Sequence, residues 1–69
     1  MDTIELNNLV NEVCAATTDR GKRLWERVRW RKGYMVDGQL HPAVSLSKLE
    51  IRAQLVVMLE ELEAMLDIG

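Results

Sequence analysis

Seven of the nine basic residues of this 69-residue chain fall between positions 20 and 32, together with both tryptophans. Glu26 is the only acid in that stretch, so its net charge is +6 (seven bases minus one acid), against −8 for the remainder (two bases against ten acids). Guanidinium groups pair with carboxylates and phosphates, and indole rings fill interface pockets or stack on nucleobases. The stretch therefore predicts binding to a nucleic acid, to an acidic protein or to the chain's own acidic segment.

Residues that carry out catalysis are sparse by comparison. Cys14 is the single cysteine and lies in an apolar segment without a neighbouring base, which predicts a buried, inert thiol. His41 could meet Asp37, but one histidine and one carboxylate do not make a metal site, so packing or capping in a loop is preferred. The four glycines are scattered rather than gathered in a phosphate-binding loop. We expect a non-enzymatic protein without a metal or other cofactor.

The length of the chain limits how it is stabilised. We expect one domain over residues 1–69, and a chain this short buries only about 60% of its unfolded surface. One cysteine cannot form an internal disulfide, so self-association or a partner remains as the source of further stability. No signal peptide is evident, and the longest apolar run, residues 55–59, is far below the roughly 20 residues that span a bilayer. These features predict a cytoplasmic protein without membrane contact, in a cell or in an infected host.

Apolar spacing predicts helices over residues 3–16 and 20–33. Asp2 and Glu5 have capping-box spacing at the start of the first helix. Residues 17–19 are all of N-cap type, and Gly21 is unfavourable inside a helix, which favours a break between the two. One continuous helix is the alternative, because the apolar phase is kept from one segment to the next.

Glycines also mark the segment that follows the second helix. Gly33 is a plausible C-cap for that helix. Asp37 and Gly38 lie between two short apolar runs, which predicts a tight turn or a very small hairpin. Three residues in each arm are expected to be too few for a stable sheet.

The last helix is predicted over residues 48–66. Ser47 and Glu50 form a capping box at its start, and a heptad seam follows: Ile51, Leu55, Met58, Leu62 and Met65. A second apolar patch points almost the opposite way and consists of Leu49, Ala53, Val56 and Val57. A helix that is apolar on two faces lies between neighbours, so this patch is expected to contact a second copy or a foreign partner. We predict a homodimer.

The basic helix presents two kinds of side chain. Leu24 and Val28 mark its inward face, Trp25 lies at the edge of that face, and Trp30 lies about 140° away and is expected to be exposed. The predicted contacts with a protein partner are Arg23, Arg27, Trp30, Arg31 and Tyr34. The candidate nucleic-acid contacts are Arg20, Lys22, Arg29 and Lys32.

The alternative is that the basic charge is neutralised within the chain. If the last helix folds back antiparallel, its glutamates come level with the start of the basic helix, which would pair Glu60, Glu61 and Glu63 with Arg20, Lys22 and Arg23.

Residues 24–66 resemble the C-terminal part of phage terminase small subunits. The resemblance rests on a helix containing Trp and Arg (24–30), a variable loop with glycines (33–38), His41-Pro42-Ala43, and a leucine-patterned helix from Arg52 to Leu62. It implies an all-helical, oligomeric DNA-packaging component of phage origin.

Together these observations predict an all-α fold, a small hairpin of two or three helices completed by dimerisation. The preferred function is that of a small phage or mobile-element protein that docks on a host or viral protein and modulates or inhibits it. The alternative is a packaging component that contacts DNA through residues 20–32. The protein partner is preferred because the −8 charge of the remainder would repel a phosphate backbone.

Overall fold

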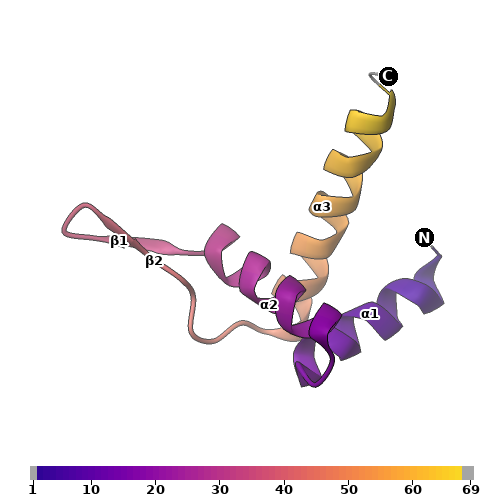
Figure 1. Ribbon diagram of the computed structural model, residues 1–69, viewed down its shortest axis with the longest axis horizontal. Helices are drawn as coiled ribbons and strands as arrows, with labels where there is room; N and C mark the ends of the chain where they lie inside the picture. Colours follow the sequence, from indigo (N-terminus) through magenta and orange to yellow (C-terminus); the bar gives the residue numbers. More distant parts are fainter. Residues whose placement is uncertain (1, 68–69) are drawn as a thin grey trace.

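The structure, a computed structural model, describes the backbone of residues 2–67. Its elements follow in the order α1 (Thr3–Ala15), α2 (Asp19–Arg31), β1 (Tyr34–Val36), β2 (Gln39–His41) and α3 (Lys48–Asp67). Figure 1 shows the three helices meeting in one region, from which the β1–β2 hairpin extends away. The expected small helical fold is confirmed, with a two-stranded sheet added, and the break between α1 and α2 excludes one continuous helix.

At the N-terminus of each helix, a side-chain oxygen accepts a hydrogen bond from a free backbone N–H group. The Asp2 carboxylate accepts a hydrogen bond from the backbone N–H of Glu5 at 2.8 Å, and the Thr18 hydroxyl accepts one from Gly21 at 3.0 Å. At the start of α3, Ser47 and Glu50 exchange hydrogen bonds in both directions, which confirms the predicted capping box. These bonds satisfy N–H groups that have no partner within the helix.

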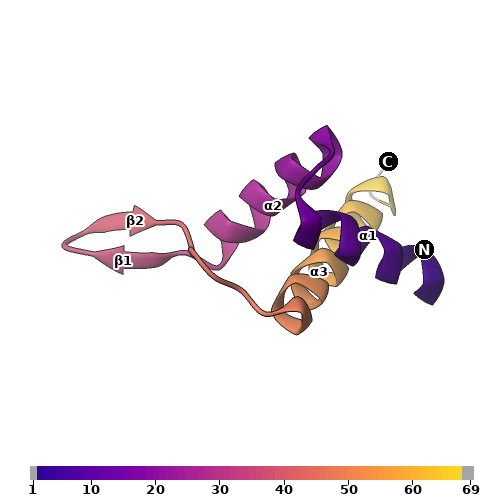
Figure 2. The ribbon, with the colours of Figure 1, turned by 90° about the horizontal axis from the view of Figure 1, so that it is seen from below.

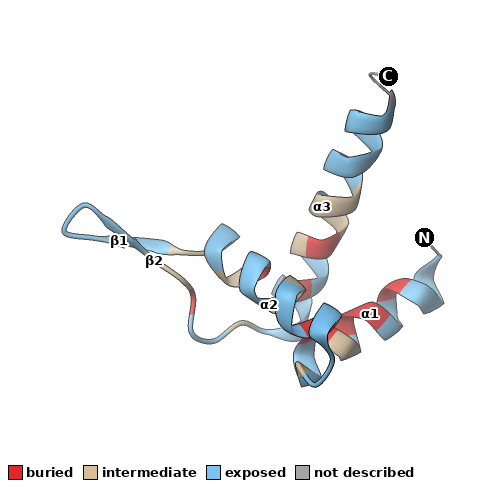
Figure 3. Cartoon of the chain, viewed as in Figure 1, coloured by how far each residue is buried: buried red, intermediate tan, exposed pale blue. Residues whose placement is uncertain are grey.

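The core lies where the three helices meet. Its buried side chains come mainly from α1, with one from α2 and two from α3: Leu6, Leu9, Val10, Val13, Val28, Ile51 and Leu55. Leu24 and Trp25 pack against this cluster from α2, so the predicted inward face of the basic helix is confirmed. Figure 3 shows the burial concentrated on α1 and the first part of α3, and little of it on the hairpin.

The close approach of α2 to α1 depends on Gly21. A Cβ atom at this position would lie 2.6 Å from the carbonyl oxygen of Glu12, closer than such atoms approach in proteins. The Glu12 carboxylate also accepts hydrogen bonds from Thr18 at 2.9 Å and from two nitrogens of Arg20 at 2.7 and 2.8 Å. The end of α1 is thereby fixed to the start of α2.

The predicted tight turn or very small hairpin is confirmed, and its three-residue arms pair as strands, contrary to the expectation that they are too few for a sheet. Asp37 and Gly38 both have positive φ (50° and 80°), which suits a tight two-residue turn. Tyr34 pairs with His41 across the strands, and their rings stack with centroids 5.7 Å apart. His41 therefore packs, as preferred from the sequence.

Contacts with α2 hold the base of the hairpin. The backbone N–H of Ala43 donates to the carbonyl of Arg29 at 3.0 Å, and the Arg29 side chain donates back to the carbonyl of Ala43 at 2.9 Å. A Cβ atom on Gly33 would lie 2.5 Å from the carbonyl oxygen of His41. Gly33 thus serves close approach to the hairpin, since α2 ends at Arg31 and Lys32 is its C-cap. Figure 2 shows the hairpin projecting beyond the helices in a second view.

The predicted alignment of the acidic residues of α3 with the start of α2 is wrong. Arg20 pairs with Glu12 of α1, at 2.7 Å. It is Arg31, at the end of α2, that contacts α3, through Gln54 at 3.1 Å and Glu61 at 2.7 Å. The C-terminal end of α2 therefore lies beside the middle of α3. Along the described residues, no helix is both long and apolar enough to cross a bilayer.

Candidate protein-binding groove

A groove of about 490 Å³ runs between α2 and the second half of α3, here defined as residues 58–66. Four residues of α2 and four of α3 line it: Glu26, Arg27, Trp30, Arg31, Met58, Glu61, Leu62 and Met65. The structure thus brings together three of the five residues predicted to bind a partner. Tyr34 lies outside the groove on the hairpin, and Arg23 lies one helical turn before Arg27.

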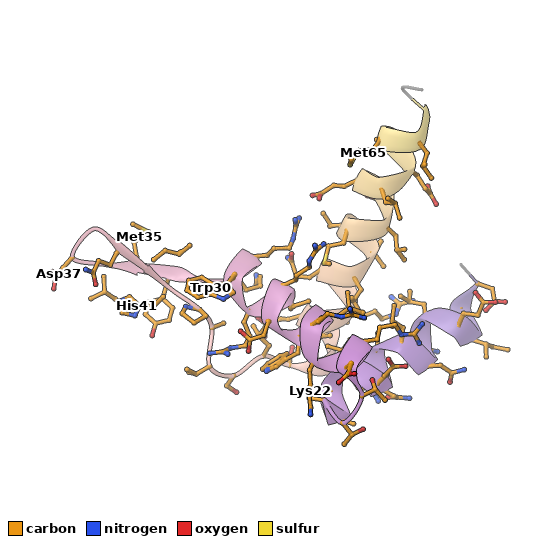
Figure 4. The ribbon with its side chains drawn as sticks, in the orientation of Figure 1. Lys22, Trp30, Met35, Asp37, His41 and Met65 are labelled. Carbon is orange, nitrogen blue, oxygen red and sulfur yellow. The ribbon has the colours of Figure 1, made fainter. Side chains whose placement is uncertain are left out.

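The two tryptophans have different environments, as predicted. Trp25 is half-buried against the core, whereas 47% of Trp30 is exposed. Figure 4 shows Trp30 near the C-terminal end of α2 and Met65 projecting from the far part of α3. Both line the same groove, so the exposed indole has apolar neighbours on a separate helix.

The floor of the groove continues the apolar seam of α3. Ile51 and Leu55, early in the seam, are 3% and 2% exposed, because α1 and α2 cover them. Leu62, Met65 and Leu66 are 52%, 69% and 72% exposed. The helix has 20 residues and α1 and α2 have 13 each, so α3 is longer than its neighbours by about two turns. One face of α3 is therefore core at its start and open surface at its end.

A smaller hollow of about 220 Å³ joins the groove to the core. It shares three residues with the groove and reaches the buried leucines of α1 and α3 through Leu9, Leu24, Arg27, Leu55, Met58, Leu59 and Leu62. The groove thus has a continuous apolar path towards the interior.

Ion pairs neutralise most of the charge that lines the groove. Arg31 and Glu61 pair across it at 2.7 Å, and Glu26 pairs with Arg29 at 2.6 Å. Arg27 forms no ion pair with any described residue and is the uncompensated charge of the groove. The groove therefore favours an anionic group near Arg27.

The candidate nucleic-acid contacts divide into two groups. Arg20 and Arg29 are held in ion pairs with Glu12 and Glu26. Among the described residues, Lys22 and Lys32 have no ion-pair partner within 4 Å. Figure 4 shows Lys22 on the side of α2 away from the second half of α3.

Lys32 has an electrostatic influence on the start of α3. The pKa of Glu50 is lowered, first by the hydrogen bond from the backbone N–H of Ser47, then by the Ser47 hydroxyl, with a smaller contribution from the charge of Lys32. The hydrogen bonds of the capping box thus outweigh the charge of Lys32.

The predicted dimer face is not one open patch. Val56 is half-buried and packs against the core, so it is not available as part of an open patch. Leu49, Ala53 and Val57 are exposed. The prediction that Cys14 is buried is also wrong: this residue follows the buried Val13 on α1 and lies on the solvent side of the helix.

Reasoning from the sequence missed the contribution of α3 to the groove. The heptad seam containing Met58, Leu62 and Met65 was assigned to packing, because a pattern does not show where the covering helices end. The sequence feature that could have revealed the groove is the length of the last helix, which is greater than that of either helix that could cover its apolar seam. Among the side chains that the structure describes, those of residues 2–66, no three histidine, cysteine or acidic groups lie together so as to hold a metal ion.

Comparison of the chain with protein-family models, with curated proteins and with solved structures finds no match.

Proposed function

We propose that this is a non-enzymatic interaction protein that binds an amphipathic helix of a protein partner in the groove between α2 and α3. The observation that carries the proposal is the position of Trp30. Its half-exposed indole lines one groove together with Arg27 and the exposed apolar side chains of α3. Tryptophan and arginine are the residues most enriched among those that dominate binding energy at interfaces.

The chemistry of the groove defines the helix that fits it. An amphipathic helix lays an apolar stripe into a hydrophobic groove, with contacts repeating every three to four residues. Leu62 and Met65 supply such a floor, and Arg27 supplies a cation at its edge. The bound helix should therefore carry a leucine-like stripe with carboxylates beside it.

DNA binding is the second candidate, and the packaging component that residues 24–66 resemble would use it. In its favour, α1 and α2 are joined by a turn of three residues and α2 is strongly basic, an arrangement found in helix-turn-helix proteins. Four basic residues of α2 and its C-cap have no ion pair with the described part of the chain: Lys22, Arg23, Arg27 and Lys32. Against it, Glu60 and Glu63 lie outside the groove on α3, form no ion pair with any described residue and would repel a phosphate backbone that extends past α2.

Peptide binding tests the proposed function. The probe is a synthetic peptide of four helical turns with a leucine stripe flanked by glutamates, and its control has lysines in place of the glutamates. Calorimetry should detect binding of the acidic peptide at micromolar concentration and weaker binding of the basic one. Trp30→Ala should lower the affinity for the acidic peptide at least about tenfold, which corresponds to a loss of about 1.4 kcal/mol of binding free energy.

Two control variants separate binding from folding. Lys22→Ala, on the side of α2 away from the groove, should leave peptide affinity unchanged. Trp25→Ala should lower the free energy of unfolding by about 3 kcal/mol, as truncation of a packed aromatic does, whereas Trp30→Ala should leave stability nearly intact. Equal affinity for the two peptides, or an affinity that Trp30→Ala does not change, contradicts the proposal.

A further inference from the structure

The second half of α3 has the chemistry that the groove requires of its ligand. Leu62, Met65 and Leu66 form an exposed apolar stripe. The same nine residues contain three glutamates and no basic residue, so their charge is −3. Glu61 is paired with Arg31, whereas Glu60 and Glu63 form no ion pair with any described residue. Of these two, Glu63 flanks the apolar stripe, at about 100° of helical rotation from Leu62, and Glu60 lies on the opposite side of the helix.

We infer that the helix seated in the groove is the second half of α3 from a second copy of this chain. The inference rests on the proposed function, because it requires that the groove receive a helix. An acidic, leucine-bearing helix would lie beside the uncompensated Arg27. It would also cover the exposed Trp30 and Leu62.

Two-fold symmetry lets each copy place the second half of its α3 in the groove of the other copy at the same time. The second half of α3 is itself one wall of the groove, so each copy is both receptor and ligand. Such an interface uses the same surface on both copies and closes without open ends. The heptad spacing of the seam suits helix-on-helix packing of this kind.

The two helices must run antiparallel. The first half of each α3 is covered by α1 and α2 of its own chain, as Figures 1 and 3 show. A parallel pair would place both helical bodies at the same end, where they would overlap. An antiparallel pair places the bodies at opposite ends and overlaps only the exposed halves, with the two-fold axis near Leu62, the midpoint of residues 58–66.

This surface differs from the one predicted from the sequence. Val57 lies five residues, or about 140° of helical rotation, from Leu62 and so points away from the seam. Val56 of the predicted face is already packed against the chain's own core. The exposed end of α3 offers three large apolar side chains on one face instead, Leu62 and Met65 of the seam and the neighbouring Leu66.

Native mass measured by light scattering tests the dimer. The wild-type chain should have twice its own mass at micromolar concentration. The double variant Leu62→Glu/Met65→Glu should have the mass of one chain and keep its helical circular dichroism, because both side chains are more than half exposed. Val57→Glu on the opposite face is the matched control and should remain a dimer.

Cross-linking tests the antiparallel register. In a Cys14→Ser background, Leu62→Cys should form a disulfide between chains in a glutathione redox buffer, because residue 62 meets its own copy near the axis. Val57→Cys, also solvent-exposed, should stay reduced in the same buffer. Disulfide formation by Val57→Cys but not by Leu62→Cys would assign the interface to the other face and overturn the inference.

The outcomes separate the inference from the proposed function. A wild-type chain that is monomeric but binds the acidic peptide in a manner sensitive to Trp30→Ala overturns the dimer and leaves the proposed function standing. A monomer that binds no peptide overturns both. In a dimer the acidic peptide must displace the partner's helix from the same groove, so peptide in excess should lower the mass towards that of one chain. A dimer that binds the peptide without any change of mass overturns the inference and leaves the proposed function standing. A dimer whose mass is unchanged by Leu62→Glu/Met65→Glu also overturns the inference, since the interface must then lie elsewhere.

Discussion

Ala16 and Gly21 lie on either side of the turn between α1 and α2, and each has a backbone requirement that helix propensity alone does not describe. Ala16 ends α1 with φ 51° and ψ 41°, the left-handed conformation that glycine adopts without cost. Gly21 lies inside α2, where alanine is normally the better residue, but its missing Cβ makes room for the carbonyl of Glu12.

Exchanging these residue types should therefore give effects of opposite sign. Ala16→Gly should raise the free energy of unfolding by about 1 kcal/mol, because it relieves the left-handed strain. Gly21→Ala should lower it by about 1–3 kcal/mol, because the new methyl group overpacks the contact with backbone that cannot rotate away. Chemical denaturation measures both. A stabilising Gly21→Ala would show that the ends of α1 and α2 are not in close contact.

Glu12 should make stability depend on pH in a defined range. Its pKa is lowered from 4.5 to about 2, first by the hydrogen bonds from Arg20 and then by that from Thr18. Since the folded-state pKa is the lower one, this contribution is fully present above pH 4.5 and is lost as the pH falls towards 2. Thermal unfolding should show a difference between wild type and Glu12→Gln at pH 6 that shrinks below pH 4.5.

Removing the partner of Glu12 provides the control. Arg20→Gln should reduce the pH dependence over the same range, because the main cause of the lowered pKa is gone. If the difference between wild type and Glu12→Gln were constant from pH 6 to 2, the ion pair would not contribute to stability.

At the scale of elements, the local signals were sufficient to place the helices. The capping residues Asp2 and Ser47, a break near residues 17–19 and the inward Val28 were predicted from spacing and residue type alone. Each of these signals acts within a few residues along the chain. The ends of the helices agree with the expected ranges to within two residues.

Features that depend on contacts between elements were predicted poorly. The turn of the hairpin was predicted, but its arms were expected to be too short to pair as a sheet. The base of the hairpin is held by Arg29 and by close packing at Gly33, neither of which is visible in the strand pattern. The partner of Arg31 on α3 could not be found either, because it depends on the angle at which α2 meets α3. The groove is formed by that same contact, so only its α2 side could be predicted.

At the scale of the whole molecule, the basic residues are concentrated in residues 20–32 and the acidic residues in the rest of the chain, and only part of this charge is paired. Three of the seven bases of residues 20–32 form ion pairs, with Glu12, Glu26 and Glu61. Four bases remain without an ion pair among the described residues, on a chain whose net charge is −2. A phosphate backbone would therefore gain at most a few contacts and would meet the acidic α3 beside them.

Salt dependence should distinguish a protein ligand from DNA. If all four free bases contact phosphates, the logarithm of affinity should fall with the logarithm of salt concentration with a slope of about −3.6, so raising the salt from 50 to 200 mM should weaken binding about 150-fold. The affinity for the acidic peptide, which Trp30 and Arg27 hold, should fall less than about tenfold over the same range of salt concentration.

We therefore expect gel-shift titrations with a mixed-sequence DNA duplex to show weak binding at low salt and none at micromolar protein in 200 mM salt. Lys22→Ala, which leaves the groove intact, should reduce the residual DNA binding and leave peptide binding unchanged. Micromolar DNA binding that persists at 200 mM salt and is lost in Lys22→Ala would instead favour the packaging component, with α2 as its DNA contact. The side of α2 that faces away from the groove would then be the functional surface, and the groove would serve assembly alone.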